Sequence, residues 1–157
     1  MSLEKQIQQD IKAAMLAKEK TRLESLRGIK AAILLAKTAE GAVLAKDEAG
    51  NEVLADDAIV KLIQKLVKQR KETAEIYKQQ GRPELAENEL SEASFMEVYL
   101  PTQLTDEEIT AELVKIIAQV GATSQKEMGK VMGVATKAMA GRADGRKIGE
   151  LVRKLLN

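Results

Sequence analysis

Apolar residues recur at helical spacing in seven segments of the chain, and this periodicity constrains the fold more than any other feature. The first segment shows the pattern with Leu3, Ile7, Ile11 and Met15, one residue in every four, which line one face of an α-helix. An aromatic content of 2% also disfavours a sandwich or barrel, whose strands are rich in aromatic residues. We therefore predict an all-α protein.

The segments divide the chain into two predicted domains. Residues 1–98 form an N-terminal helical bundle or hairpin stalk, residues 99–104 form a linker, and residues 105–157 form a compact three-helix C-terminal domain. Pro101 marks the linker because it disfavours helix at the residue before it. The four N-terminal helices are expected at about residues 3–17, 22–38, 57–80 and 83–98. A short alternation at 42–45 suggests a hairpin-like excursion, but we interpret residues 40–55 as a loop.

Residues typical of helix ends support these boundaries. Ser2 suits the N-cap of the first helix, Asp56 or Asp57 that of the third, and Asp144 that of the last. Gly81 suits the position just after the third helix. Three pairs have the spacing of a capping box, in which a Ser or Thr and a Glu three residues later bond backbone N–H groups: Thr21 with Glu24, Thr105 with Glu108, and Ser124 with Glu127.

Four charged residues fall within the apolar faces of the N-terminal helices on a helical wheel. Lys30 lies in the second helix, Arg70 in the third, and Glu89 and Glu92 in the fourth. In one interpretation, their long side chains reach solvent at the edge of the bundle. In the other, they form a partly buried ion network in which Arg70 pairs with Glu89 or Glu92.

The residue types that are missing exclude several classes of function. The chain has no cysteine and no histidine, which removes disulfides, thiol nucleophiles, the usual zinc sites and the Ser-His catalytic relay. The acidic run from Asp106 to Glu108 is better explained as a first helical turn favoured by the helix dipole than as a metal site. We assign no catalytic residue, and we expect no cofactor and no metal.

The sequence also lacks membrane signals. No apolar run approaches the roughly 18 residues of a membrane span, and the start of the chain has no signal-peptide pattern. We therefore expect a cytoplasmic protein without a membrane partner.

A net charge of +1 conceals a division into blocks. Residues 122–157 carry eight basic and three acidic side chains, residues 1–38 carry eight and four, and residues 39–121 carry nine and seventeen. Charge separation of this kind points to an anionic partner for the two ends of the chain.

Residues 121–149 combine glycines and cations within a helical pattern. Gly129 and Gly133 lie on the flank of the predicted helix, beside a stripe of lysines. The stripe, Lys126, Lys130 and Lys137, is opposite an apolar face formed by Met128, Val131, Met132, Ala135 and Met139. Because a glycine inside a helix costs about 1 kcal/mol relative to alanine, this pair should be there to admit a close backbone. That backbone belongs either to a neighbouring helix or to a ligand.

The same stretch supplies a candidate RNA-binding surface. Its lysine stripe and the turn GRADGRK at residues 141–147 suit a phosphate backbone. The scarcity of aromatic residues disfavours base stacking, so structured RNA is the expected ligand. A merely solvated helix face is the alternative. The candidate residues are Lys126, Gly129, Lys130, Gly133, Lys137, Arg142, Arg146 and Lys147.

Several motifs together resemble the GatB/YqeY family. They are EVYLPTQLTDEE at residues 97–108, GATSQKEMGKVMG at 121–133 and GRADGRKI at 141–148, with ESLRGIKAAI at 24–33 and KQRKETAEIY at 68–77 in the order expected. The similarity extends over nearly the whole chain, and the joint occurrence of these motifs is more specific than any one of them.

The resemblance implies a stand-alone relative of the helical tail on the GatB subunit of the glutamine-dependent aminoacyl-tRNA amidotransferase. That tail is understood to contact tRNA, so tRNA or another structured RNA is the implied partner. The alternative is a protein-interaction adaptor that docks on a synthetase or an amidotransferase. Carbon-nitrogen ligase activity with glutamine as amido-N-donor belongs to other parts of that enzyme, and this chain is too short to contain them.

Overall fold

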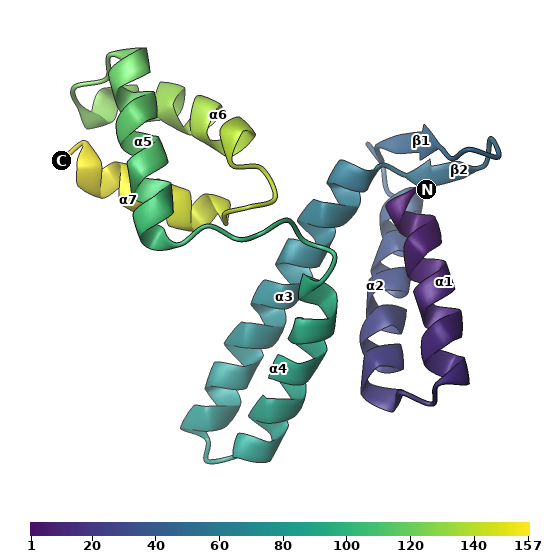
Figure 1. Cartoon of the computed structure of the whole chain (residues 1–157). Coiled ribbons are helices and arrows are strands. Elements are labelled where there is room, and N and C mark those ends of the chain that lie inside the picture. Colours follow the sequence, from purple (N-terminus) through teal and green to yellow (C-terminus); the bar gives the residue numbers. More distant parts are fainter. The chain divides into compact units, whose positions relative to one another are not determined.

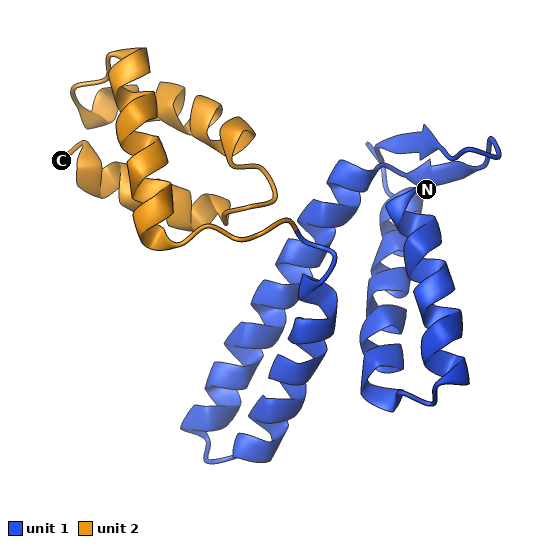
Figure 2. Ribbon diagram, in the orientation of Figure 1, with its two compact units in different colours: residues 1–100 blue, residues 101–157 orange.

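The computed structural model describes residues 1–157, which form two compact units, residues 1–100 and residues 101–157 (Figure 2). Tyr99 and Leu100, assigned by sequence to the linker, belong to unit 1. Helices make up both units, and the only strands are those of one short hairpin (Figure 1). The prediction of an all-α protein is confirmed.

Unit 1 consists of two helical hairpins joined by a small β-hairpin. Helix α3 packs along α4, and α2 packs against both α1 and α4. The elements are α1 (Leu3–Leu16), α2 (Lys20–Thr38), β1 (Leu44–Lys46), β2 (Glu52–Leu54), α3 (Asp56–Gln79) and α4 (Pro83–Glu97).

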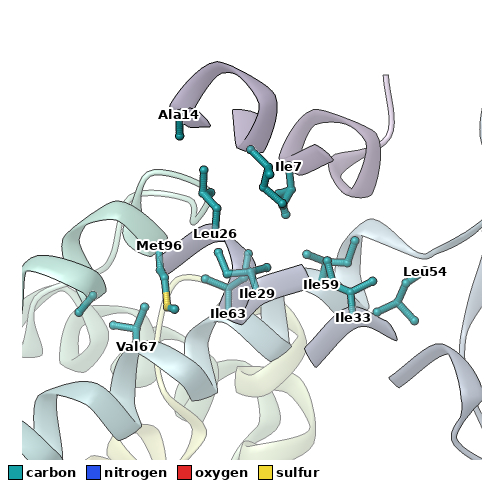
Figure 3. Packing of buried hydrophobic residues seen from close by; sticks show 12 residues of the cluster. Ile7, Ala14, Leu26, Ile29, Ile33, Leu54, Ile59, Ile63, Val67 and Met96 are labelled. Atoms are coloured by element: carbon teal, nitrogen blue, oxygen red, sulfur yellow. The ribbon is translucent and has the colours of Figure 1, made fainter. Parts of the chain in front are cut away.

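The core of unit 1 is built from aliphatic side chains supplied by all four helices and by β2. Figure 3 shows Ile29 of α2 beside Ile63 of α3, with Met96 of α4 and Ile7 of α1 around them. These four side chains are at most 1% exposed. Since burying one such side chain contributes about 1.5–3 kcal/mol, this cluster is the main stabilising feature of the unit.

The start of α2 differs from the prediction. Glu19 is its N-cap and makes no side-chain capping bond, so the capping box of Thr21 and Glu24 was wrong. The cause lies at the end of α1, where Lys18 adopts a left-handed conformation with φ of 58°. The N–H of Glu19 then bonds to the carbonyl of Ala14 at 3.0 Å. The chain reverses within so few residues that Thr21 already lies inside the first turn of α2.

Asp56 caps a different helix from the one predicted. It is the first residue of α3, whose N-cap, Ala55, makes no side-chain bond. Its Oδ1 atom accepts instead from the N–H of Leu3 at 3.0 Å, at the start of α1. Ser2 caps α1 as predicted, through the N–H of Lys5 at 3.2 Å. The side chains of Ser2 and Asp56 therefore each accept from one of the first N–H groups of α1.

Residues 40–55 contain a β-hairpin where a loop was predicted. Strands β1 and β2 are antiparallel, with Ala45 opposite Val53. The carboxylate of Asp47 accepts from the N–H groups of Ala49 at 2.9 Å and Asn51 at 2.8 Å, which fixes the turn. The backbone hydrogen bond from Asn51 is the main reason that the pKa of Asp47 lies below its ordinary value. The alternation at residues 42–45 overlaps β1 only in part, and strands of three residues are too short to extend it.

Unit 2 is a three-helix domain with its own core. Its elements are α5 (Asp106–Val120), the 3₁₀ turn η1 (Gln125–Glu127), α6 (Met128–Ala138) and α7 (Gly145–Leu155). The fully buried side chains at its centre are Leu113 from α5, Val131 from α6 and Val152 from α7. Met139, which follows α6, is also fully buried.

The helix caps of unit 2 agree with the sequence in two of three cases. The capping box of Thr105 and Glu108 is present, and Asp144 caps α7 by accepting from the N–H of Arg146 at 3.3 Å. The box of Ser124 and Glu127 was wrong, because Ser124 makes no capping bond and Glu127 accepts from the N–H of Thr123 at 2.8 Å. Helix α6 accordingly begins at Met128, after the 3₁₀ turn.

The length and polarity of the helices bear on membrane insertion. No helix in the structure combines the length and the apolar character required to span a bilayer.

Candidate functional site

One face of α6 and the end of α5 enclose an open depression of about 740 Å³ in unit 2. Four of the eight residues proposed from sequence as an RNA-binding surface line it. The full lining is Val120, Gly129, Lys130, Gly133, Val134, Lys137 and Ala138.

The two glycines leave the surface of the depression open. Gly129 and Gly133 are exposed, and a Cβ atom built on either would meet no atom within 4 Å apart from its chain neighbours and the backbone of α6. The sequence left open whether a neighbouring helix or a ligand uses this space. No helix of unit 2 packs there, since α6 turns its buried residues, Val131 and Ala135, to the core.

Two lysines border the glycines. Lys130 and Lys137 are exposed, and neither forms an ion pair in the structure. A separation of seven residues is almost two helical turns, which places them on one side of α6, about 10.5 Å apart along the axis. Lys126 is also exposed and unpaired, but it lies in η1 and does not line the depression.

Apolar side chains, exposed or half-buried, complete the lining, and they were not predicted from the sequence. Val134 is 42% exposed although it is a large aliphatic residue, and Val120 and Ala138 lie beside it. The sequence did indicate this exposure, because a helical wheel places Val134 outside the apolar face that carries Met128 and Met132. The depression therefore combines a partly apolar surface with two free ammonium groups.

The three cations after α6 have other contacts. Arg142 Nη2 donates to the carbonyl of Ala138 at 2.7 Å, so its guanidinium bonds a terminal carbonyl of α6. Lys147 Nζ lies 3.2 Å from Asp106 Oδ2 and joins α7 to the start of α5. Arg146 Nε is 3.9 Å from Glu150 Oε1, and its side chain is 74% exposed. None of the three lines the depression.

The turn before α7 differs from the phosphate site expected there. Asp144 places a carboxylate at the N-terminus of the helix and accepts from the N–H of Arg146. A helix N-terminus attracts an anion through its free N–H groups and its dipole. Here a side chain of the protein already supplies that anion, so the turn is a capped helix start.

The charged residues singled out in unit 1 form one pair. Arg70 Nε lies 3.2 Å from Glu92 Oε2, between α3 and α4. Lys30 and Glu89 take part in no ion pair in the structure. Of the four residues expected in a network, the structure brings only Arg70 and Glu92 together.

Comparison with known proteins places the chain in a family. Residues 4–156 match the model of the family described as Yqey-like protein. The chain belongs to the YqeY-like family. A curated relative is "Altered inheritance of mitochondria protein 41, mitochondrial" from Pyrenophora tritici-repentis, to which this YqeY-like chain is 31% identical over 141 residues, 87% of this chain and 71% of the relative.

The relative's name bears on the expected location of this YqeY-like protein. The name assigns the fungal protein to mitochondria. The sequence-based expectation of a cytoplasmic location is therefore not confirmed by the comparison, and it stays a prediction.

Proposed function

We propose that this YqeY-like protein binds structured RNA, with tRNA as the expected class, through the depression on α6. The observation that carries the proposal is the pairing of open glycines with unpaired lysines. Gly129 and Gly133 have free space above them, and Lys130 and Lys137 stand beside that space without a carboxylate partner.

The energetics of α6 support a role for the glycines outside the packing of unit 2. Each glycine inside a helix costs about 1 kcal/mol relative to alanine. Helices recover that cost when a glycine lets another element pack closely, and no other element lies within 4 Å of a Cβ at Gly129 or Gly133. A ligand backbone that approaches α6 supplies the missing close contact.

The chemistry of the lysines favours phosphate as the approaching group. Ammonium groups bind phosphate oxygens as point charges, and such contacts fix the position of a nucleic acid without reading its sequence. The depression contains no aromatic side chain, which suits recognition of RNA shape rather than base stacking. Two phosphate contacts give modest affinity, near the non-specific range of about 10⁻⁴ to 10⁻⁶ M.

A charge-reversal experiment tests the proposal. Lys130→Glu with Lys137→Glu reverses both cations of the depression. The matched control, Arg153→Glu with Lys154→Glu, makes the same change in charge at two exposed residues of α7 that lie outside the depression and form no ion pair. Binding of labelled total tRNA is measured by gel shift and fluorescence anisotropy at several salt concentrations.

The two variants give distinct expected outcomes. The depression variant should bind tRNA at least about tenfold more weakly, and the slope of log K against log salt should fall by about 2, because two phosphate contacts are lost. The control variant should lose much less of its affinity for tRNA. Unchanged tRNA binding in the depression variant, or an equal loss in both variants, would reject the site.

The apolar part of the depression supports a second candidate, a protein-interaction adaptor. Val134, Val120 and Ala138 offer a small apolar surface of the kind that a partner protein buries. In a pull-down with nuclease treatment, a synthetase or amidotransferase that is retained without RNA and is lost on Val134→Ser would favour this function. Amide transfer from glutamine forms no part of either proposal.

A further inference from the structure

The two edges of the β-hairpin in unit 1 differ in their hydrogen bonding. Ala55 donates to the carbonyl of Val43 and Asp47 donates to the carbonyl of Asn51, both at 2.9 Å. Because hydrogen-bonded pairs alternate along an antiparallel ladder, residues 43, 45 and 47 face β2. The N–H and C=O groups of Leu44 and Lys46 therefore point away from the hairpin, as do those of Glu52 and Leu54 on the other side.

The outer edge of β2 is satisfied by side chains. Lys37 Nζ donates to the carbonyl of Glu52 at 3.2 Å, and Glu4 Oε1 accepts from the N–H of Leu54 at 3.4 Å. The two side chains also pair with each other, Lys37 Nζ to Glu4 Oε2 at 3.3 Å, and Glu4 is only 6% exposed. An ion pair thus closes this edge to any further strand.

The outer edge of β1 has no such cover. All three of its residues are exposed, Leu44 at 39%, and no side chain hydrogen-bonds to the outward backbone groups of Leu44 or Lys46. Exposed edges of this kind are templates for the addition of another strand. Of the two edges of the hairpin, only that of β1 is available.

An apolar groove of about 370 Å³ begins where this edge begins. Val43 lines the groove and directly precedes Leu44, the first residue of β1. The floor is formed by Ala36 of α2, Leu54 of β2, and Ala58 and Leu62 of α3.

The charged side chains that line the groove are mostly basic. Lys61 and Lys65 line it one turn apart on α3, and Glu40 is the one acidic lining residue. Lys46 adds a third cation on the strand itself. None of the three lysines forms an ion pair in the structure, and Glu52 lies opposite Lys46 in the ladder. Lys61 and Lys65 are therefore the cations most open to a partner.

We propose that the free edge of β1 and the adjoining groove bind an extended, acidic segment of a partner protein by strand addition. The main chain of the segment bonds to the outward groups of Leu44 and Lys46. Its apolar side chains enter the groove, and its carboxylates lie against Lys46, Lys61 and Lys65. A second copy of this chain fits less well, because its own β1 would bring a second Lys46 to the same edge.

Three short fluorescein-labelled peptides test the surface on the full chain by fluorescence anisotropy. In the first, valine alternates with glutamate; in the second, lysine replaces glutamate; in the third, proline replaces alternate residues of the first and removes the N–H groups that a ladder needs. The first peptide should bind and the other two should not. Equal binding of the first and third peptides would exclude strand addition, and binding of the second would exclude the charge argument.

Matched variants locate the site. Lys46→Pro removes an outward N–H while leaving the bonds between β1 and β2, and Lys46→Gln removes only the charge. Lys46→Pro should weaken the acidic peptide about fivefold more than Lys46→Gln, the value of one hydrogen bond of about 1 kcal/mol. Equal effects would overturn the proposal. Leu44→Pro removes the other outward N–H and repeats the test if Lys46→Pro lowers the melting temperature.

A charge variant that leaves the strand intact completes the test. Lys61→Glu with Lys65→Glu should abolish peptide binding. Lys12→Glu with Lys20→Glu, two exposed lysines at the far ends of α1 and α2, is the control and should retain it. An equal loss of peptide binding in both variants would mean that the peptide responds only to the net charge of the protein. A dimer in sedimentation that dissociates on Lys46→Pro would assign the edge to a second copy and reject the acidic segment.

Discussion

Nε of Arg70 on α3 lies 3.2 Å from Oε2 of Glu92 on α4, and the side chains are only 20% and 14% exposed. Each charge is therefore held largely out of water with the other as its partner. Pairs of this kind add little net stability compared with apolar residues, but losing one partner leaves the other unpaired at a cost of about 3–5 kcal/mol.

Arg70→Ala should accordingly be strongly destabilising, near the lower end of that range because solvent still reaches both groups. Arg70→Met should be milder, since it keeps the aliphatic stem packed on α4. Adding Glu92→Met should recover much of the loss by removing the stranded carboxylate. Urea unfolding of the single and double variants measures these differences. Equal, small losses for Arg70→Ala and Arg70→Met would show that the pair contributes nothing.

Gly28 of α2 lies against the same guanidinium. A Cβ at Gly28 would be 3.2 Å from Arg70 Nη2 and 3.7 Å from the terminal methyl of Met96. Gly28→Ala gains about 1 kcal/mol of helix propensity but displaces the guanidinium from Glu92. The gain in stability from Gly28→Ala should appear in full only when Arg70 is also replaced by Met. A double-mutant cycle measures the coupling, and an identical effect of Gly28→Ala in both backgrounds would contradict it.

Tyr99 and Asp10 link α1 to the segment after α4. Tyr99 Oη donates to Asp10 Oδ2 at 2.6 Å. Burial, followed by this hydrogen bond and the Asp10 charge, raises the pKa of Tyr99 well above its ordinary value of 10.0. The folded state then holds the phenol proton where the unfolded state releases it. This contribution to stability is present below about pH 10 and is lost as the pH rises further.

Tyr99→Phe should lower stability at neutral pH by about 1 kcal/mol, the value of one hydrogen bond. It should also flatten the decline of stability above about pH 10. The control is Tyr77→Phe, since the hydroxyl of Tyr77 forms no hydrogen bond in the structure. Unfolding curves at increasing pH distinguish the variants, and parallel declines for Tyr99→Phe and the unsubstituted protein would contradict the prediction.

Lys37 anchors the β-hairpin through Glu4 and the carbonyl of Glu52. Lys37→Ala strands a carboxylate that is 6% exposed, so the hairpin should loosen and stability should fall by about 3 kcal/mol. Hydrogen exchange at Leu54 and Ala55 should accelerate. Lys30→Ala, on the same helix and without an ion pair, should change stability by less than about 0.5 kcal/mol. Unchanged exchange in Lys37→Ala would mean that the pair does not hold the hairpin.

Local chemistry made much of this fold predictable. Helix periodicity placed all seven helices, and the bonds between Thr105 and Glu108 depend only on neighbouring residues. Contacts distant in the sequence were not predictable. Glu4 bonds to Lys37 and to Leu54, 33 and 50 residues away, and nothing around Glu4 signals those partners.

Only part of the candidate site could likewise be predicted from the sequence. A helical wheel places Gly129, Gly133, Lys130 and Lys137 together because all four belong to one helix. The wheel contains no information about Val120, which comes from α5, or about the carbonyl of Ala138 that holds Arg142. The sequence therefore groups the residues that α6 supplies alone, but it does not show that Arg142, Arg146 and Lys147 have contacts of their own.

The glycines of α6 allow stability and binding to be separated. At Gly129 and Gly133 a methyl group enters open space, so Gly129→Ala and Gly133→Ala should each stabilise the unit by up to about 1 kcal/mol in urea unfolding. If the depression admits an RNA backbone, both should also weaken tRNA binding, because the methyl groups fill the surface that the backbone approaches. Gly121→Ala is the control. Its surroundings are equally open, but its φ of 75° makes alanine unfavourable by about 1–2 kcal/mol, so it should destabilise the unit and leave binding intact. More stable variants with unchanged tRNA affinity would leave the glycines of α6 without a role in RNA binding.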